Sequence, residues 1–483
     1  MPQNPARVVV VSPMPPEKAA YALARYSRSP DSIRQSLDWV RTHDEKAFLE
    51  SYYFQYGHAS IADLGHATFC FEGVSELAAI EIEDEPLWDG QARSSRYQDF
   101  SKAGVIAPPE LSSIPACLAA YQSATETLLS AYHQLHTKTL DYLLDRHPRP
   151  ESMKPEPYRR ALAARAYDVA RYVLFLGIPT GVGQVSSLRT LEKQVRRLGA
   201  SPYAEVRDIA AEMAQACAAP PGCLWDAAAP QEPLAPTLAR HADPDPFPQK
   251  SRASLAAWAA QNFPTTVTPS PASVDLVMPA DPLDEIVATL LYPVTHQPFR
   301  CLYDHITGWS LGRKREVVDV AVEGRARRDE LLREFRSGYA FLFDVVVDIG
   351  AFRDLHRHRR CQQICQPYTE ALGHETPALL IEAGLEDFYH QALDRASAAR
   401  RRIGEASPEA AHYLLPFATR MRCLFKMDFA EAEYISRLRS GVKGHFAYRD
   451  IAWKMREKMM AAAPELGRLI DATPPWIEDA LTR

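Results

Sequence analysis

The segment Arg353-Asp-Leu-His-Arg-His-Arg-Arg-Cys-Gln-Gln-Ile-Cys-Gln-Pro-Tyr368 directly follows an apolar run, residues 341–352, whose composition favours a strand. Its first eight residues include four arginines and two histidines, and Asp354 is the only carboxylate among them. A packed protein rarely places so much positive charge beside a buried strand without a partner. Guanidinium groups match phosphate oxygens two at a time. The segment therefore predicts a bound phosphate or diphosphate.

Two other interpretations of this segment need weighing. His356, His358, Cys361 and Cys365 have the spacing His-x-His-x-x-Cys-x-x-x-Cys, which is not that of a zinc knuckle. Arginines beside a dication would also be unfavourable, so we expect no metal. The remaining alternative is that the arginine cluster serves structure alone.

Composition limits the class of protein. A chain of 483 residues should form two or three domains. Its 46% hydrophobic and 24% charged residues are those of a soluble globular protein. The formal charge of −6 argues against a general nucleic-acid binder, so any anion site must be local. Eight irregularly spaced cysteines suit a reducing cytoplasm, and the apolar run 8–11 is too short for a signal peptide or a membrane span.

The pattern of elements repeats along the chain. Each half has short helices, a strand pair, a basic turn and then three or four long helices, which indicates a duplication. We expect one domain at 1–217, a Pro-rich connector at 218–281 with one short helix near 254–261, and a second domain at 282–483. Strands are expected at 8–12, 68–82 and 341–352, and helices at 16–25, 31–41, 44–56, 115–144, 156–175, 181–199, 204–217, 282–291, 301–312, 386–403, 408–417, 428–439 and 446–462.

Short motifs in the first half resemble those of the flavin-dependent thymidylate synthases, the ThyX family. Tyr56-Gly-His-Ala-Ser60 is similar to that family's Gly-His-x-Ser turn, and Arg93-Ser-Ser-Arg-Tyr97 to its Ser-x-Arg-Tyr element. The family's Arg-His-Arg hallmark is absent here, because Asp84-Glu85-Pro86 stands in its place, a charge reversal that would repel a diphosphate. Further segments that resemble the family are Thr68-Phe-Cys-Phe-Glu-Gly-Val-Ser75, Ala170-Arg-Tyr-Val-Leu174 and Ser186-Ser-Leu-Arg-Thr-Leu191.

The second half carries the missing hallmark as Arg357-His358-Arg359 but lacks the Gly-His-x-Ser turn. Its Cys365-Gln-Pro-Tyr368 is a reduced form of the Ser-x-Arg-Tyr element, two residues closer than usual, and Ala430 replaces the arginine of the Asn-x-Arg segment. Ala411-His-Tyr-Leu-Leu-Pro416 and Ser436-Arg-Leu-Arg439 resemble the family's C-terminal helices.

The resemblance implies an α+β fold of two ThyX-like repeats, each a small, mostly antiparallel sheet packed with long helices. Family members build each active site between subunits of a homotetramer. We therefore expect one composite site per chain, formed by the two halves, and a homodimer that mimics the family tetramer.

The activity that the resemblance implies is reductive methylation of dUMP, with methylenetetrahydrofolate as carbon donor, NADPH as reductant and FAD as cofactor. By position, FAD would be held by Arg357, His358 and Arg359 with His58, Ser60 and Arg189. The nucleotide phosphate would be bound by Ser94 and Arg96. Arg171, with Arg197 or Arg439, would lie near the uracil and act in catalysis.

Several of these assignments have alternatives. Asp354 stands where the family has a glutamine that touches the nucleotide, so a flavoprotein acting on another nucleotide or acceptor is a second hypothesis. The degraded repeats leave a third, a non-catalytic nucleotide-binding or assembly protein. His58 could be a packed turn histidine, and Arg93 and Arg96 could lie on a solvated face. Arg171, Arg189 and Arg197 could each be helix-surface residues paired with nearby carboxylates.

Overall fold

The structure is a computed structural model, and it describes residues 14–26, 33–43, 50, 59–96, 99–221, 228, 231–270, 272–326 and 329–481. The expected strand 8–12, nearly all of the expected helix 44–56, and His58 lie outside these residues. The chain divides into two compact units. The smaller contains residues 1–74, 87–93 and 180–245, and the larger contains residues 75–86, 94–179 and 246–483.

The smaller unit holds a sheet whose strand order is β1-β3-β2 in the part of the chain that is described. β2 pairs antiparallel with β3, and Gly183 of β3 lies opposite Gln91 of β2. Ser187 ends β3 and begins the next helix, because its hydroxyl accepts the amide hydrogen of Thr190 as an N-cap. The elements are α1 (Pro16–Tyr26), α2 (Ile33–Val40), η2 (Ala59–Leu64), β1 (His66–Ser75), β2 (Trp88–Ala92), β3 (Pro179–Ser187), α7 (Leu188–Gly199), α8 (Ala204–Ala218) and α9 (Pro236–Ala239).

The expectation of one helix over 181–199 is therefore wrong for its first part, which is strand β3. Residues 179–187 contain glycine and β-branched side chains, which favour an extended backbone over a helix. The expected helices at 16–25, 31–41 and 204–217 are confirmed as α1, α2 and α8, with ends that differ by one or two residues.

The larger unit holds an antiparallel sheet with the strand order β4-β5-β7-β6. Nearly every residue of the central strands β5 (Phe341–Asp348) and β7 (Arg420–Met427) is buried, as in a sheet covered on both faces. Leu342 and Leu424 pack in one core with helix α11 (Pro282–Leu291), while α19 (Phe446–Ala462) contacts β4 (Val274–Val277) and β5. β6 spans Gln362–Cys365.

Both expected strand regions end in a capped helix. β1 stops at Ser75, whose hydroxyl accepts from the amide of Ala78, and α4 (Glu76–Glu83) follows. β5 stops at Asp348, whose carboxylate accepts from the amide of Ala351, and α14 (Ile349–Leu355) follows. Continuous strands over 68–82 and 341–352 are therefore wrong predictions, because the cap residues at their middle were overlooked.

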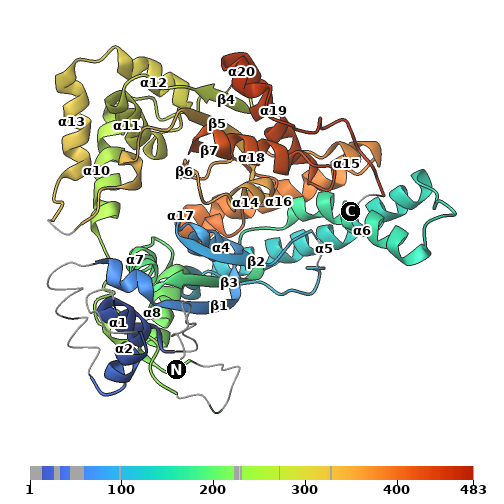
Figure 1. The fold of residues 1–483 in the computed structure, drawn as a ribbon. Helices are drawn as coiled ribbons and strands as arrows, with labels where there is room; N and C mark the ends of the chain where they lie inside the picture. The colour runs from blue at the N-terminus through green and yellow to red at the C-terminus, as the bar shows by residue number, and fades with distance from the viewer. Residues whose placement is uncertain are drawn as a thin grey trace, which may run out of the picture. The chain divides into compact units, whose positions relative to one another are not determined.

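Long helices complete the larger unit, and α16 (Glu386–Gly404) packs against α5 (Pro115–Arg146) (Figure 1). The expected helices 115–144, 282–291, 386–403, 428–439 and 446–462 are confirmed, whereas α17 (Pro408–His412) is much shorter than expected because Pro416 interrupts the pattern. The remaining elements are η3 (Pro109–Ser113), α6 (Pro155–Ala170), η4 (Arg171–Val173), α10 (Phe247–Asn262), η5 (Tyr292–Val294), α12 (Phe299–Thr307), α13 (Leu311–Val322), η6 (Arg333–Phe335), α15 (Ala378–Glu382), α18 (Phe429–Arg439) and α20 (Pro464–Gly467).

Two loops of the larger unit join through hydrogen bonds in which donor and acceptor roles are exchanged. Phe175 and Pro416 form an antiparallel β-bridge at the centre. Around this bridge, each hydrogen bond that the first loop donates to the second is matched by one that the second loop donates to the first. These bonds run from Leu176 N to Leu415 O, from Phe417 N to Leu174 O, from Gly177 N to Tyr413 O and from Ala418 N to Tyr172 O.

Candidate functional site

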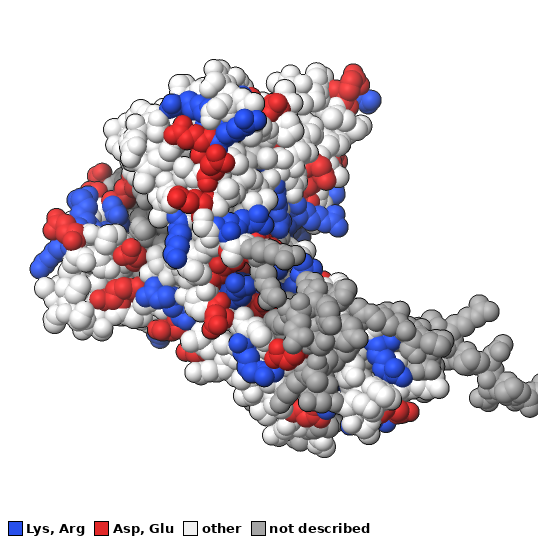
Figure 2. Space-filling model, turned by 90° about the vertical axis from the view of Figure 1, so that its left-hand side faces the viewer, with Lys and Arg blue, Asp and Glu red and all other residues white. Residues whose placement is uncertain are grey.

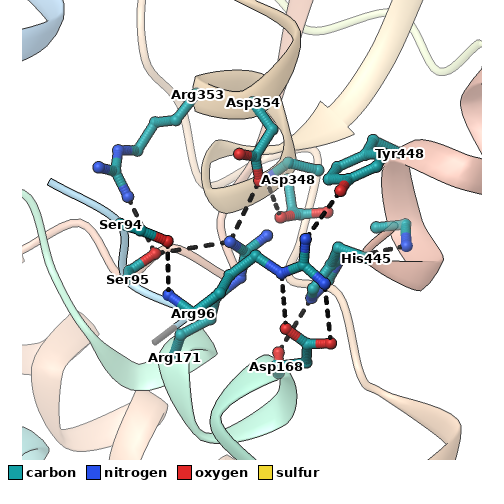
Figure 3. Close-up of polar contacts among 12 residues, drawn as sticks. Ser94, Ser95, Arg96, Asp168, Arg171, Asp348, Arg353, Asp354, His445 and Tyr448 are labelled. Carbon is teal, nitrogen blue, oxygen red and sulfur yellow. Dashed lines mark hydrogen bonds and ion pairs between the residues drawn. The ribbon is translucent and has the colours of Figure 1, made fainter. Parts of the chain in front are cut away.

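Four segments of the larger unit bring a group of charged side chains together in its interior (Figure 3). Ser94, Ser95 and Arg96 belong to the turn after β2, and Asp168 and Arg171 lie where α6 ends in η4. Arg353 and Asp354 lie on α14, while His445 caps α19, which carries Tyr448. We call this set the arginine site.

Arg96 is held by protein groups on all sides of its guanidinium. Its Nε and Nη2 atoms donate to the two carboxylate oxygens of Asp168, at 2.8 and 3.3 Å. Nη1 donates to the hydroxyl of Tyr448 at 2.8 Å, and Nη2 also donates to the carbonyl of Lys443 at 3.2 Å. Both side chains of this ion pair are buried. Arg96 thus acts as a cross-link among three segments, and it is not on a solvated face.

Arg171 is the most deeply buried cation of the arginine site, with a side chain that is 1% exposed. Nη1 donates to Asp354 at 3.2 Å and lies 3.5 Å from the hydroxyl oxygen of Ser95. Its Nε and Nη2 atoms have no hydrogen-bond partner among the described residues. A buried N–H group without an acceptor lowers the stability of the fold. The two groups are therefore available to donate hydrogen bonds to a ligand. Arg171 is not a helix-surface residue.

Asp354 is ionised by its surroundings. Burial would raise the pKa of this carboxyl group, but Arg171, followed by Arg96, Arg357 and Arg353, brings it below its usual range. A carboxylate in this form accepts hydrogen bonds and donates none.

Arg353 joins the first part of the chain to α14. Its Nη2 atom donates to Glu76 at 2.6 Å, its Nη1 atom donates to Ser95 at 3.2 Å, and its guanidinium lies 5.0 Å from the centre of the Phe417 ring. Each arginine of the site is therefore paired with one carboxylate: Arg96 with Asp168, Arg171 with Asp354, and Arg353 with Glu76.

Two further titratable groups lie behind these pairs. Asp348, the N-cap of α14, accepts a hydrogen bond from the hydroxyl of Tyr172, and burial raises the pKa of its carboxyl group to about 6. The His445 ring contacts the carbonyl oxygen of Asp168 through Nε2 at 3.0 Å and accepts from the amide of Ala447 through Nδ1. Burial holds the pKa of His445 well below its usual range, so the ring is neutral.

A second group follows α14 and involves α18. Arg439 Nε donates to His358 Nε2 at 2.7 Å, and His358 Nδ1 lies 3.4 Å from a carboxylate oxygen of Glu431. The guanidinium of Arg439 also lies 5.6 Å from the centre of the Tyr448 ring, and Arg96 lies 5.8 Å from the same ring. Tyr448 thus links this group to the arginine site.

The remaining residues of the Arg357-His358-Arg359 motif face a less enclosed environment. Arg357 and Arg359 are half-buried, and the guanidinium of Arg357 makes no hydrogen bond or ion pair within the described part of the chain. In the first half, at the position where the motif is missing, Asp84 pairs with Arg333 at 2.6 Å. The charge reversal there is compensated by a cation from a distant segment.

The other predicted residues that the structure describes lie in the smaller unit. Ser60 is exposed in η2, and Arg197 is half-buried on α7. Arg189 pairs with Asp63 at 3.1 Å. The structure therefore collects Ser94, Arg96, Arg171 and Asp354 in one place, with Arg439 and His358 joined to them through Tyr448.

Some residues of the site were not found from the sequence: Glu76, Asp348, Glu431, His445 and Tyr448. Glu76 and Asp348 adjoin helix starts, where an Asp or Ser before a helix is a readable signal. His445 is also a helix cap, but of a residue type that is rarely read as one. Glu431 and Tyr448 are single residues on helices, without a pattern. Among the described residues no group of three or more His, Cys, Asp or Glu side chains could hold a metal ion, and no helix has the length and apolarity to cross a bilayer.

The surface charge is mixed. Figure 2 shows Lys and Arg side chains close to Asp and Glu side chains over the face that it presents. Figure 2 also shows a run of Lys and Arg side chains across the middle of that face.

Comparison with known proteins places these features in a family. The sequence model for the thymidylate synthase complementing protein matches residues 9–220 and 338–465, which together are more than half of the chain. UPF0159 proteins of Chlamydia muridarum and Thermoplasma acidophilum are both 24% identical to it, over 85% and 93% of this chain and 77% and 93% of theirs.

Two crystal structures of the flavin-dependent thymidylate synthase from Helicobacter pylori, with FAD and dUMP, align at 16% identity with 41% of this chain and 88% of theirs, at TM-scores of 0.27 and 0.26. The family match confirms the resemblance seen in the motifs. The chain belongs to the family of the thymidylate synthase complementing protein.

Proposed function

We propose that this chain is a flavin-dependent thymidylate synthase-like enzyme that converts dUMP by reductive methylation at one composite site. The observation that carries the proposal is the joining of motifs from the two halves. Arg353 of the second half shares Ser95 with Arg171 of the first half, and Arg171 in turn pairs with Asp354. Family membership supplies the reaction class.

A two-repeat architecture is the first part of this proposal. The sheet of the smaller unit has the strand order β1-β3-β2, and the second sheet without β4 has the order β5-β7-β6. In both, the strand that comes third in the chain lies between the other two. In both, the first strand leads into a capped helix. The exchanged hydrogen bonds around Phe175 and Pro416 are those expected of a pseudo-twofold axis. The same correspondence continues into the capped helices, where Glu76 N and Leu77 N donate to Ile178 O and Leu176 O, and Ile349 N and Gly350 N donate to Thr419 O and Phe417 O.

The correspondence also supports a single site per chain. The counterpart of Arg171 is His412, a buried ring whose pKa is lowered by burial to about 4, so it is neutral. The counterpart of Arg353 on α4 is Ile80, which is apolar and buried. The second copy of the site therefore lacks two cations that the first copy has.

The residues fit the ligands of the proposed reaction. Arg171 has two buried donors without an acceptor, which suit a carbonyl or phosphate oxygen of the nucleotide. Arg357 and Arg359 would hold the diphosphate of FAD, because the guanidinium of Arg357 is hydrogen-bonded to no carboxylate among the described residues. When bound, the flavin supplies the hydride. The protein groups bind and orient the nucleotide, and Arg171 stabilises negative charge on the ring.

The test measures flavin binding and turnover separately. Purified protein should take up FAD and show its visible absorbance, and it should release tritium from 5-tritiated dUMP with methylenetetrahydrofolate and NADPH. Arg353→Leu should abolish tritium release, whereas Arg402→Leu, at an exposed position of α16, should leave it unchanged. Tritium release by Arg353→Leu at the wild-type rate would contradict the composite site. A strain that requires thymidine should be rescued by the wild-type gene alone.

Asp354 favours one alternative. A carboxylate in contact with the nucleotide would accept a different base edge from an amide, so the enzyme could act on another nucleotide or acceptor with the same flavin. FAD uptake without tritium release would support that alternative, and a colourless protein unable to bind FAD would support a non-catalytic role. We further infer a homodimer, because the resemblance implies sites at subunit contacts; light scattering on the flavin-loaded protein tests this. The irregularly spaced cysteines support a cytoplasmic location.

A further inference from the structure

We infer that His358 and Glu431 are positioning residues that fix the orientation of Arg439, and that His358 is not a ligand of the flavin. The inference rests on the proposed function for the role of Arg439, but its geometric basis is independent of it. His358 lies in the Arg-His-Arg motif, Arg439 ends α18, and Glu431 lies in the first turn of the same helix.

The hydrogen bonds of His358 fix its tautomer. An arginine N–H can donate but not accept, so His358 Nε2, 2.7 Å from Arg439 Nε, must carry a lone pair. The ring hydrogen is then on Nδ1, which faces Glu431 at 3.4 Å. Both ring nitrogens are therefore engaged by protein groups. A flavin would have to displace one of them to use this side chain.

The ring of His358 bridges two charged residues of α18 that are too far apart to contact each other. Glu431 and Arg439 are eight positions apart, so their Cα atoms are about 12 Å apart along the helix, too far for a direct ion pair. The imidazole of His358 spans that gap and is neutral. It uses Nε of Arg439 and leaves the two Nη atoms free of any hydrogen bond within the described residues.

Other contacts hold His358 rigidly in this position. Its carbonyl oxygen accepts from the side-chain amide of Gln363 at 2.8 Å and from the thiol of Cys361 at 3.0 Å. Its ring lies edge-on to Tyr434, with ring centres 5.7 Å apart. The Nη edge of Arg439 beside Tyr448 is thus presented in one direction, as a group that must meet a developing charge requires.

The charge on His358 decides whether the contact exists. Burial lowers the pKa of His358, and Arg439 and Arg359 add to that, while Glu431 opposes them. A protonated ring would present a donor to the donor of Arg439. The orientation of Arg439 should therefore persist at neutral pH and be lost when the pH falls below the lowered pKa of His358.

Two substitutions at one position separate the roles. His358→Gln keeps an acceptor near the place of Nε2, and His358→Asn keeps a donor near the place of Nδ1 but no acceptor for Arg439. We expect His358→Gln to bind dUMP within threefold of the wild type at pH 8. His358→Asn should weaken dUMP binding at least tenfold, as Arg439→Met does, with FAD affinity unchanged in both histidine variants. His390→Asn, at a half-exposed histidine of α16 near Glu386, is the control.

The pH dependence gives a second readout that a merely structural role would not move. The ratio of the wild-type and His358→Gln dissociation constants for dUMP, measured by calorimetry, cancels the titration of the nucleotide phosphate. The wild type should lose affinity relative to His358→Gln as the solution is acidified. Equal losses of FAD affinity in both histidine variants, or a ratio independent of pH, would overturn the inference.

A stability cycle keeps the test valid if dUMP does not bind at all, which would be a failure of the proposed function. The melting temperatures of His358→Asn, Arg439→Met and the double variant should show that the second substitution adds little to the first. Additive shifts would mean that the two residues do not act together, and they would overturn the inference.

Discussion

The amide of Gly177 donates to the carbonyl of Tyr413 at 2.7 Å in a place that leaves no room for a side chain at residue 177. A β-carbon there would lie 2.0 Å from the hydroxyl oxygen of Tyr121 and 3.2 Å from the carbonyl oxygen of Tyr413. Tyr121 is fully buried, and its hydroxyl donates to Ile106 O, so it cannot move away freely. At the corresponding position of the second loop, Ala418 carries a β-carbon without difficulty.

We therefore predict that Gly177→Ala lowers the free energy of unfolding by about 1–3 kcal/mol through overpacking. Tyr121→Phe removes the clashing oxygen, so the double variant should lose less than the sum of the two single losses. Urea denaturation measures all three, with Ala418→Gly as the matched substitution across the bridge. A Gly177→Ala protein as stable as the wild type would contradict the packing described here.

Removing the partner of Arg96 should be more damaging than removing the pair. Asp168→Asn leaves a buried guanidinium without its carboxylate, and we expect a loss of about 3–5 kcal/mol. Arg96→Met combined with Asp168→Leu should recover most of that loss, because neither charge remains. Tyr448→Phe removes one acceptor and should cost about 1 kcal/mol. Equal losses in Asp168→Asn and in the double variant would count against the pair.

The buried carboxyl group of Asp348 should make stability depend on pH in the acidic range. Its folded-state pKa of about 6 is above the unfolded value of ~3.9, so the folded protein holds the proton more tightly. This contribution is fully present below about pH 4 and is lost as the pH rises through about 6, for a total of about 3 kcal/mol at most.

Asp348→Asn keeps the N-cap of α14 but cannot titrate. The difference in unfolding free energy between this variant and the wild type should therefore change between pH 4 and pH 7. Asp428→Asn is the control, because Asp428 caps α18 in the same way from an exposed position. A difference that stays constant with pH, or one that Asp428→Asn reproduces, would refute the prediction.

Restoring the missing arginine in the first half should not restore an anion site. Asp84→Arg would face Arg333, and the two like charges should lower stability by roughly 1–2 kcal/mol, a modest figure because both side chains are partly exposed. The swap Asp84→Arg with Arg333→Asp should regain most of the melting temperature. If the swap is no more stable than Asp84→Arg alone, the pair does not hold the two segments.

The sequence predicted the long helices well because their evidence is local. α11 begins after Asp281, whose carboxylate accepts from two backbone amides, and α19 follows His445, so caps and apolar periodicity agree. The strand-to-helix changes at Ser75 and Asp348 were missed because the apolar composition continues through them and hides the cap. Helix α10 was predicted only in part, because the proline-rich composition around it masked its first turns. The expected helix over 301–312 is wrong in its last part, because α12 ends at Thr307 and Ser310 caps a separate helix, α13.

The site was predictable only where a motif spanned it. Arg96, Arg171 and Asp354 were named from motifs, but no pattern links Arg353 to Glu76, which lies 277 positions away. The segment around Arg353 looked uncompensated because its carboxylate comes from another part of the chain. Ion pairs of this kind depend on tertiary contacts between distant segments. The position of one residue in the sequence does not reveal such contacts. The roles of the predicted residues stay predictions.

The one-to-one pairing of Arg96, Arg171 and Arg353 with carboxylates has a consequence for how fast a ligand arrives. Paired charges largely cancel beyond a few ångströms, so these three arginines produce little attraction for a dianion at a distance. Capture of a phosphate by them depends on exchange, in which the incoming oxygens compete with Asp168, Asp354 or Glu76 at short range. The association rate at this site should thus respond weakly to ionic strength. The dissociation rate should depend on how readily the carboxylate re-forms its ion pair with the arginine.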